Sequence, residues 1–166
     1  MSHRAFEIIM KNLSYRISKL ESENDIPFDL LLLADETIEA IEKYIYDSDV
    51  YIVTENAQLN PIAVVVLFRI NNTEIEIKNI AVSESSQGKG IGSYLVGEIK
   101  KIAKRENFNT IIVGTPDCSY REIKFYEKNG FTKFDIKKDF FVKNYPEPII
   151  ENGILLRDMI ILKWNL

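Results

Sequence analysis

Three glycines and a lysine lie close together in the stretch SSQGKGIGS, residues 85–93, between two apolar segments. Glycine has no side chain and adopts positive φ angles readily, so Gly88, Gly90 and Gly92 would let backbone N–H groups approach a ligand. If a helix begins directly after them, its unpaired N–H groups and its dipole favour an anion. The flanking residues must decide between an anion-binding loop and a flexible surface turn.

Two common phosphate-binding motifs do not match this stretch. A Walker P-loop has the pattern GxxxxGK[ST], whereas Lys89 is followed by Gly90 and no glycine stands five residues before Gly88. A Rossmann loop has the pattern GxGxxG directly after the first strand of a βαβ unit. Here the spacing is GxGxG, and SESSQ separates the glycines from the preceding strand-like segment.

The histidine and cysteine counts exclude several kinds of catalytic site. The only histidine is His3 and the only cysteine is Cys118, so neither a Ser–His–Asp nor a Cys–His site can form without His3. A zinc site of cysteines and histidines is equally implausible, and no metal is expected. A single cysteine cannot form an intramolecular disulfide. The absence of such a disulfide is typical of proteins in the reducing cytoplasm. We interpret Cys118 as a small buried residue.

The composition is that of an ordinary soluble globular protein, with 46% hydrophobic and 28% charged residues and a net charge of −4. No basic stripe is present, which argues against a nucleic-acid partner, whereas an acidic protein attracts cations such as protonated amines. The longest apolar run, residues 61–68, is far shorter than the ~20 residues of a membrane-spanning helix. Charges interrupt the apolar residues of the N-terminus, so no signal peptide is expected.

Periodicity predicts a mixed α/β domain over residues 1–166. Helical spacing of Ile38, Ile41 and Ile45 predicts a helix over 37–46, with Asp35 as its candidate N-cap. Ile91, Leu95, Ile99 and Ile102 form the apolar stripe of the clearest helix, 91–107. A further helix is expected at 27–35, and another begins at a capping box formed by Ser119 and Glu122 and continues to Lys128. Strands are expected at 15–21, 50–55, 61–70, 73–82, 110–115, 131–136 and 155–164.

The apolar pattern of the strand at 73–82 changes parity. Ile75 and Ile77 are odd-numbered, whereas Ile80 and Val82 are even-numbered, so the apolar face slips by one residue near positions 78–79. A β-bulge produces such a slip and exposes backbone groups. The alternative is that both faces of the strand are buried and that parity carries no information.

Three segments together resemble the GNAT superfamily of N-acetyltransferases. Gln87-x-x-Gly90-x-Gly92 resembles its acyl-CoA loop, Q/R-x-x-G-x-G/A, which follows a bulged strand, here ending in IAV at 80–82. FYEKNGF, residues 125–131, resembles the segment around the family's tyrosine. The order agrees from about residue 50 to 136, and the tail resembles an uncharacterised bacterial subgroup. The resemblance implies a central, mostly antiparallel sheet with a bulged strand and flanking helices.

The resemblance also implies acetyl-CoA as acetyl donor. Loop amides would bind its diphosphate, with Lys89 adding a charge, and the Val82 N–H would stabilise the oxyanion. Ser119 stands where the family often has an asparagine that contacts the pantetheine arm. The cofactor-binding residues expected on this basis are Ile80, Ala81, Val82, Gln87, Gly88, Lys89, Gly90, Ile91, Gly92, Ser93 and Ser119.

Two side chains would carry the acid–base chemistry. Tyr126 matches the family tyrosine that protonates the departing CoA thiolate, and a phenol of pKa ~10 can serve a thiolate whose thiol has pKa ~8.5. Glu76, six residues before Val82, matches a glutamate that accepts the amine proton in some members. From residue patterns alone, Tyr126 could instead pack beside Ile123, and Glu76 could be solvated like Glu74. Many members use water instead of a base.

The acceptor is less well defined. In this family it is bound near the segments that correspond to 24–36 and 137–153, both rich in carboxylates and the second also in aromatics, which suits a cationic amine. The resemblance implies transfer to a small-molecule amine. The alternatives are transfer to a peptide or protein amine, and a non-catalytic acyl-CoA sensor. A homodimer is common in the family, but nothing in the sequence locates an interface.

Overall fold

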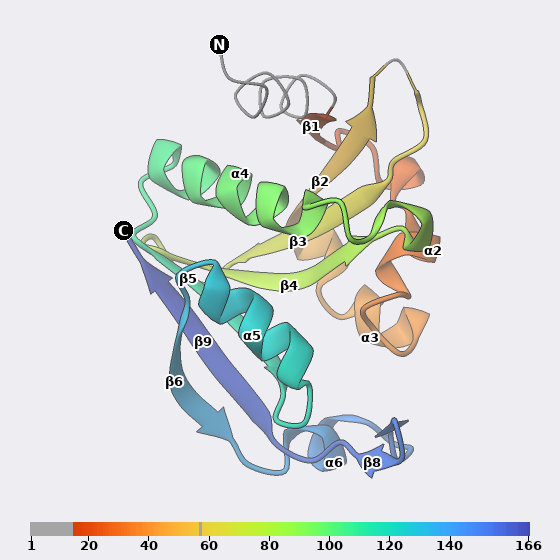
Figure 1. Ribbon diagram of the computed structural model, residues 1–166, viewed down its shortest axis with the longest axis vertical. Helices are drawn as coiled ribbons and strands as arrows, with labels where there is room; N and C mark the ends of the chain where they lie inside the picture. Colours follow the sequence, from red (N-terminus) through yellow and green to blue (C-terminus); the bar gives the residue numbers. More distant parts are fainter. Residues whose placement is uncertain (1–14, 57) are drawn as a thin grey trace. The chain divides into compact units, whose positions relative to one another are not determined.

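The computed structural model describes residues 15–56 and 58–166 (Figure 1). The N-terminal segment, with His3, lies outside the described residues. The described residues fall into two compact units, one formed by the chain up to Phe68 with Lys78–Ile99, the other by Arg69–Ile77 with Lys100–Leu166. The expectation of a single domain over 1–166 stays a prediction.

The strands are β1 (Tyr15–Lys19), β2 (Ser48–Glu55), β3 (Ala63–Arg69), β4 (Glu74–Val82), β5 (Thr110–Pro116), β6 (Thr132–Lys137), β7 (Ile150–Glu151), β8 (Ile154–Leu155) and β9 (Met159–Asn165). The α-helices are α2 (Phe28–Leu31), α3 (Ile38–Glu42), α4 (Ile91–Arg105), α5 (Tyr120–Lys128) and α6 (Phe140–Asn144). Short 3-10 turns lie at Glu23–Asp25, Ile45–Asp47 and Glu84–Ser86.

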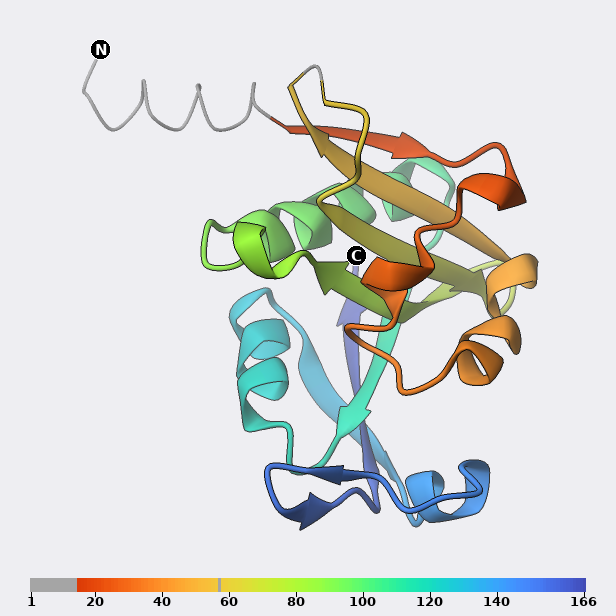
Figure 2. The same cartoon turned by 90° about the vertical axis from the view of Figure 1, so that its right-hand side faces the viewer.

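The first unit is built around an antiparallel meander. Strand β2 pairs antiparallel with both β1 and β3, and the β-branched run of β3 is buried from Ala63 to Leu67. Figure 2 shows α2 and α3 on one side of these strands and the beginning of α4 on the other. The core beneath α2 and α3 consists of Leu31, Ile41, Ile45, Val50, Val64, Val66 and Ala81.

The second unit is built around β5. The start of β4, Glu74–Ile77, pairs parallel with Thr110–Val113, and β9 pairs antiparallel with β5 and with β6. Helix α5 lies along one face of these strands (Figures 1 and 2). By hydrogen bonding, the strand order of the chain is β1-β2-β3-β4-β5-β9-β6, with β7 and β8 in a separate hairpin. The predicted mixed α/β fold with a mostly antiparallel sheet is confirmed.

The parity slip of β4 has a different origin from the one expected. Burial alternates without interruption along the strand, and the buried positions are Ile75, Ile77, Asn79 and Ala81. Asn79, only 4% exposed, takes the core position that the sequence pattern had given to Ile80. The slip therefore reflects a buried asparagine, and the bulge at 78–79 stays a prediction that the burial pattern does not require.

The predicted cap Asp35 is wrong, and the predicted cap Ser119 has the expected position but lacks the expected side-chain bond. The N-cap of α3 is Thr37, whose Oγ1 accepts the Ala40 N–H at 3.1 Å, because Thr37 has the extended backbone that a cap needs. The Asp35 carboxylate accepts the Glu36 N–H and the Tyr44 hydroxyl instead. Ser119 precedes α5 but makes no side-chain cap bond, since its ψ of 64° is not that of an extended cap.

Other boundaries differ from the sequence patterns. The helix predicted at 27–35 ends at Leu31, and the one at 37–46 continues after Glu42 only as a turn and a 3-10 segment. The strand predicted at 155–164 is two strands, β8 and β9, and α6 has no counterpart in the prediction. The stripe of α4 is confirmed, because all four of its apolar residues are buried.

Candidate functional site

The loop before α4 is fixed at its base. The Ser83 N–H donates to the Ile62 carbonyl at 2.8 Å, and residues 84–86 form a 3-10 turn. The Gln87 side-chain amide then donates to the Val82 carbonyl at 3.0 Å. Gln87 therefore holds the glycine loop against the end of β4, a structural reason for an amide side chain at this position.

Of the three loop glycines, Gly88 and Gly90 are required by the backbone conformation rather than by lack of space, whereas Gly92 has no positive φ. Gly88 and Gly90 have φ of +75° and +81°, a region that L residues rarely adopt, whereas an added Cβ would meet no heavy atom within 4 Å at either position. Gly90 is the N-cap of α4, since its carbonyl accepts the Tyr94 N–H at 3.0 Å. A Gly-rich backbone thus leads directly into the positive end of a 15-residue helix.

The electrostatic surroundings of this helix start favour an anion. The amides of Ile91 and Gly92 belong to the first turn, where an α-helix offers no carbonyl acceptor four residues earlier. No acidic residue lies in that turn. Gly88, Lys89 and Gly90 are all exposed, and Lys89 brings a positive charge. The arrangement can bind a phosphate or diphosphate through backbone N–H groups.

The end of β4 lies in the same unit as the loop. The parallel ladder of β4 with β5 consists of Glu74–Ile77 with its partners and ends there, so Ile80, Ala81 and Val82 follow beyond the last pair. Ala81 is buried, whereas Ile80 and Val82 are half-buried. The backbone groups at the end of β4 and those of the glycine loop are therefore close together along one continuous stretch of chain, residues 80–93.

Tyr126, in the second unit, is the most deeply buried of the sequence-predicted polar site residues there. Its side chain is 5% exposed and packs edge-on against Phe125 and Phe131, with ring centroids 5.1 and 5.5 Å away. Burial, with a smaller effect of the Glu122 carboxylate, raises the pKa of Tyr126 well above its ordinary value. The phenol is therefore protonated throughout the neutral range.

The FYEKNGF segment forms the end of α5. Gly130 adopts a φ of +89°, and the Asn129 side-chain amide donates to the Phe125 carbonyl at 2.9 Å. The Phe131 N–H donates to the Tyr126 carbonyl at 3.0 Å. These bonds close the helix and turn the chain so that Phe131 packs on the Tyr126 ring.

Three other residues of interest also belong to the second unit. Glu76 is half-buried on β4, opposite Ile112 of β5 in the ladder. Ser119 is half-buried at the start of α5, with its hydroxyl not engaged as a helix cap. Burial, followed by the Asp117 carboxylate, raises the pKa of the Cys118 thiol, which is consistent with an unreactive cysteine.

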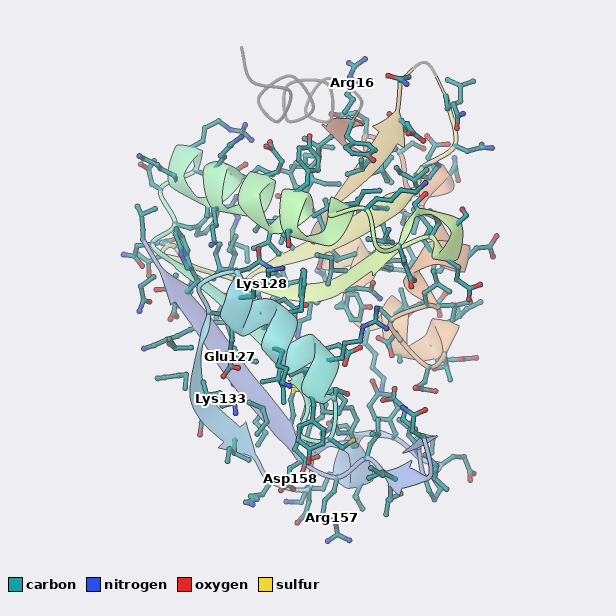
Figure 3. All side chains as sticks on the ribbon, in the orientation of Figure 1. Arg16, Glu127, Lys128, Lys133, Arg157 and Asp158 are labelled. Atoms are coloured by element: carbon teal, nitrogen blue, oxygen red, sulfur yellow. The ribbon has the colours of Figure 1, made fainter. Side chains whose placement is uncertain are left out.

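The segment at 137–153 is held in place by Asp158. Its carboxylate accepts the Asp139 N–H at 2.9 Å and the Lys138 ammonium at 3.1 Å, and these two bonds lower its pKa. Figure 3 labels Asp158 beside Arg157. Helix α6 then packs Phe141 onto Tyr145, with ring centroids 5.8 Å apart. No sequence pattern pointed to Asp158, because its partners come from a separate segment of the chain.

The segment at 24–36 is tied to β4 by residues that the sequence patterns did not select. Asn79 donates through Nδ2 to the Leu31 carbonyl and to the Tyr44 hydroxyl, and that hydroxyl donates to Asp35. In the sequence, the change of apolar parity along residues 73–82 was the signal that could have identified Asn79 as a buried polar residue. Within the described residues, the first unit thus combines the strand end, the loop and this network, and the second combines Glu76, Ser119 and Tyr126.

Two absences concern the described part of the chain only. Among residues 15–56 and 58–166, no three His, Cys, Asp or Glu side chains are grouped so that they could hold a metal ion. In the same residues, no helix has both the length and the apolar character needed to cross a membrane.

Known proteins share both the sequence pattern and the fold. The model of the acetyltransferase (GNAT) family matches residues 14–131. The uncharacterized N-acetyltransferase YvbK of Bacillus subtilis (strain 168) is 39% identical over 151 residues, which cover 91% of this chain and 96% of YvbK.

Solved structures of two proteins share the fold of this chain and are similar to it in sequence. A GNAT family acetyltransferase from Elizabethkingia anophelis with acetyl-CoA bound superposes with a TM-score of 0.87 at 39% identity, covering 92% of this chain and 99% of that one. A Bacillus subtilis acetyltransferase in complex with CoA gives a TM-score of 0.82, also at 39% identity, with coverage of 92% and 99%. From the family match, the sequence identity and the fold, this chain belongs to the GNAT family of acetyltransferases.

Proposed function

We propose that this protein transfers the acetyl group of acetyl-CoA to a primary amine of a small molecule. The observation that carries the proposal is the loop before α4, where Gly88 and Gly90 adopt positive φ and lead into an exposed helix start without acidic residues. Two solved relatives, each 39% identical to this chain, contain acetyl-CoA and CoA.

The residues present suit the diphosphate of this co-substrate. The backbone amides from Gly88 to Ser93 would hold the phosphate oxygens, and Lys89 would add a positive charge. The space beside Gly88 and Gly90 is open, because nothing lies within 4 Å of the place that a Cβ would occupy. Acetyl-CoA supplies the activated thioester, and the protein supplies binding, orientation and proton transfer.

The end of β4 would orient the thioester. Peptide groups of Ile80, Ala81 and Val82 would hydrogen-bond the pantetheine arm and the acetyl carbonyl, and the Val82 N–H would stabilise the oxyanion. A donor of this kind contributes about 2.7–4 kcal/mol to acyl transfer. In this proposal Gln87 keeps the strand end and the loop together through its bond to the Val82 carbonyl.

Tyr126 would act as the acid. As the amine nitrogen attacks the acetyl carbon and the carbon–sulfur bond breaks, negative charge gathers on sulfur, and the phenol donates its hydrogen bond and then its proton there. The raised pKa of Tyr126 keeps the proton in place but makes the phenol a weaker acid than a thiol. Proton transfer should therefore accompany cleavage rather than precede it.

The amine must lose a proton before it attacks. A lysine-like amine has a pKa of ~10.4, so only about 1 molecule in 2,500 is neutral at pH 7. We propose Glu76 as the base that accepts this proton, directly or through water, because a half-buried carboxylate on β4 can take this role. Its position also matches the glutamate of those family members that use one.

The experiment that tests the proposal is a thermal-shift measurement with acetyl-CoA, CoA, ATP and NAD, followed by thiol release with a panel of small amines. A ligand at 100 times its Kd stabilises the fold by about 2.7 kcal/mol, a rise in Tm of roughly 5–11 °C for this size. We expect a rise with acetyl-CoA and CoA only, and release of CoA with amines. A folded sample that responds to neither CoA compound would contradict the proposal. Binding without release would favour one of the two alternatives, transfer to a peptide or protein amine or a non-catalytic sensor.

A further inference from the structure

A lysine of the second unit lies against the turn that ends α5. Lys100, on α4, is half-buried, and its ammonium donates a hydrogen bond to the Asn129 carbonyl. The same ammonium lies 5.1 Å from the centroid of the Trp164 ring and 5.9 Å from that of the Phe131 ring. A Cβ added at Gly130 would meet the Lys100 Nζ and an indole carbon of Trp164, each at 3.5 Å. The turn at 129–130 is therefore in contact with a charged group from α4 and a ring from β9.

This turn closes the part of α5 that carries Tyr126. Tyr126 belongs to the last turn of the helix, just before the C-cap Asn129, and last turns are where helices fray. The Tyr126 carbonyl accepts the N–H groups of Asn129 and Phe131, both at 3.0 Å. The Phe131 ring also packs edge-on against the Tyr126 ring. The place of the phenol therefore depends on the turn at 129–131 staying closed.

A positive charge suits the end of a helix but is costly at this particular place. The dipole and the last carbonyl groups of a helix both attract a cation at its C-terminus. On α4, however, Lys100 stands between Val96 and Ala103, which are both buried, and its ammonium meets aromatic rings. Burial lowers the pKa of Lys100, which indicates that these surroundings disfavour the charge.

Stability alone thus gives a weak reason for a lysine at this position. An apolar side chain of similar length would fill the same space without the cost of burying an ammonium. What only a cationic donor accomplishes is to bind the Asn129 carbonyl from outside the helix and so to hold the end of α5 against α4 and β9.

We propose that Lys100 is a positioning residue that keeps the end of α5 closed and thereby holds the Tyr126 phenol where it meets the leaving thiolate. The inference rests on the proposed function, in which Tyr126 is the acid, and adds to it a residue that acts through Tyr126. Positioning matters for this step, because a misplacement of about 1 Å can cost on the order of 100-fold in rate. A loosened turn should therefore lower kcat, whereas binding of acetyl-CoA does not require the phenol.

The test is Lys100→Met, which keeps a side chain of similar length and removes the charge and the N–H donors. We expect kcat to fall about tenfold, with the KM values for acetyl-CoA and for an amine that gives CoA release changed less than about twofold. The Tm should change by less than about 4 °C, because the lost hydrogen bond is offset by the removal of a partly buried charge. Steady-state kinetics and thermal melts measure these quantities.

Two variants separate the charge at this place from a general change in α4. Lys104→Met removes the same charge from an exposed residue one turn later on the same helix, and it should leave kcat unchanged. Lys100→Arg keeps the charge and the N–H donors, and it should recover a large part of the wild-type kcat. An equal fall in Lys100→Met and Lys104→Met, or equal kcat values in Lys100→Met and Lys100→Arg, would overturn the inference.

A double-mutant cycle shows whether Lys100 acts through Tyr126. The variant Tyr126→Phe has no phenolic proton to position, so adding Lys100→Met to it should lower kcat by less than about a further twofold. If Lys100→Met leaves kcat unchanged in the wild-type background, or lowers it equally in both backgrounds, the inference is wrong and the proposed function stands. If Tyr126→Phe alone keeps full turnover, the proposed acid is wrong and the inference falls with it.

Amide hydrogen exchange tests the contact without any activity. We expect the amides of Asn129, Gly130 and Phe131 to exchange about tenfold faster in Lys100→Met than in the wild-type protein, and at the wild-type rate in Lys104→Met. If the wild-type protein binds no CoA compound and acetylates no amine, the proposed function fails, and this measurement decides whether Lys100 holds the turn. Faster exchange in Lys100→Met alone supports that role, and equal exchange in all three proteins overturns it.

Discussion

Two segments of the molecule, the loop that leads into α4 and helix α5 itself, present different groups. Before α4, two glycines with positive φ leave the backbone exposed and make Gly90 the N-cap. In α5, the polar group of interest is the Tyr126 hydroxyl, whose side chain is 5% exposed between two phenylalanines. The first segment relies on backbone N–H groups, which every residue except proline has, whereas the second relies on one side chain in one environment.

This difference decides how each segment can be disrupted. Backbone groups cannot be deleted, so the loop is sensitive to residues that change its conformation or add an unfavourable charge. A side chain can be deleted with its surroundings left intact, so the Tyr126 region is sensitive to the loss of single atoms. The four predictions below test this distinction, in order of decreasing effect.

Removal of the Tyr126 hydroxyl should have the largest effect. Because Tyr126→Phe keeps the ring and its aromatic contacts, we expect kcat to fall by about 10²–10⁴, the usual contribution of a positioned acid, with acetyl-CoA affinity preserved. Steady-state kinetics and CoA titration measure the two quantities. Tyr120→Phe, at a tyrosine of the same helix that is 69% exposed, is the matched control. Unchanged turnover in Tyr126→Phe would mean that another group protonates the thiolate.

The loop should respond to Gly90→Glu with loss of cofactor binding. The substitution places an L residue at a φ of +81° and a negative charge at the helix start, so we expect the Kd for CoA to rise on the order of 100-fold, about 2.7 kcal/mol. Gly153→Glu is the control, since Gly153 has a similar φ of +78° and open space. Calorimetric titration that finds equal CoA affinity in both variants would refute the loop assignment.

The stability of the fold at high pH should depend on Tyr126. Its pKa is raised in the folded state, so the unfolded chain releases the phenolic proton first, and the contribution of Tyr126 is retained below about pH 10 and lost as pH rises above it. Between about pH 10 and 12 the Tm of the wild-type protein should fall more steeply than that of Tyr126→Phe. Parallel curves in a pH series of thermal melts would contradict the buried state of the phenol.

Helix capping should give the smallest contrast. Thr37→Ala removes the oxygen that accepts the Ala40 N–H, and we expect a loss of about 1 kcal/mol in the free energy of unfolding. Ser119→Ala removes a hydroxyl that makes no cap bond, so the loss should be within about 0.5 kcal/mol. Urea unfolding measures both. A larger loss for Ser119→Ala than for Thr37→Ala would show that the Ser119 hydroxyl stabilises the fold after all.

The sequence predicted the fold well where local signals are strong. The stripe of α4 and the β-branched run of β3 identify buried faces by periodicity, and both are buried in the structure. The caps were less predictable because Asp35, Thr37 and Ser119 are all residue types that cap helices, and only the backbone conformation selects among them. The hairpin of β7 and β8 and the short helix α6 carry too few residues for a periodic signal.

What the sequence determined by itself is the chemistry that depends on residue type: glycines where positive φ is required, the helix that follows them, and the turn at Asn129 and Gly130. What only the tertiary structure decided is the chemistry that depends on partners. Burial among aromatic rings raises the pKa of Tyr126, and Asn79 bonds to the Leu31 carbonyl across a separation of 48 residues. Backbone preferences act between chain neighbours and can be read locally, whereas burial and distant hydrogen bonds exist only once the chain has folded.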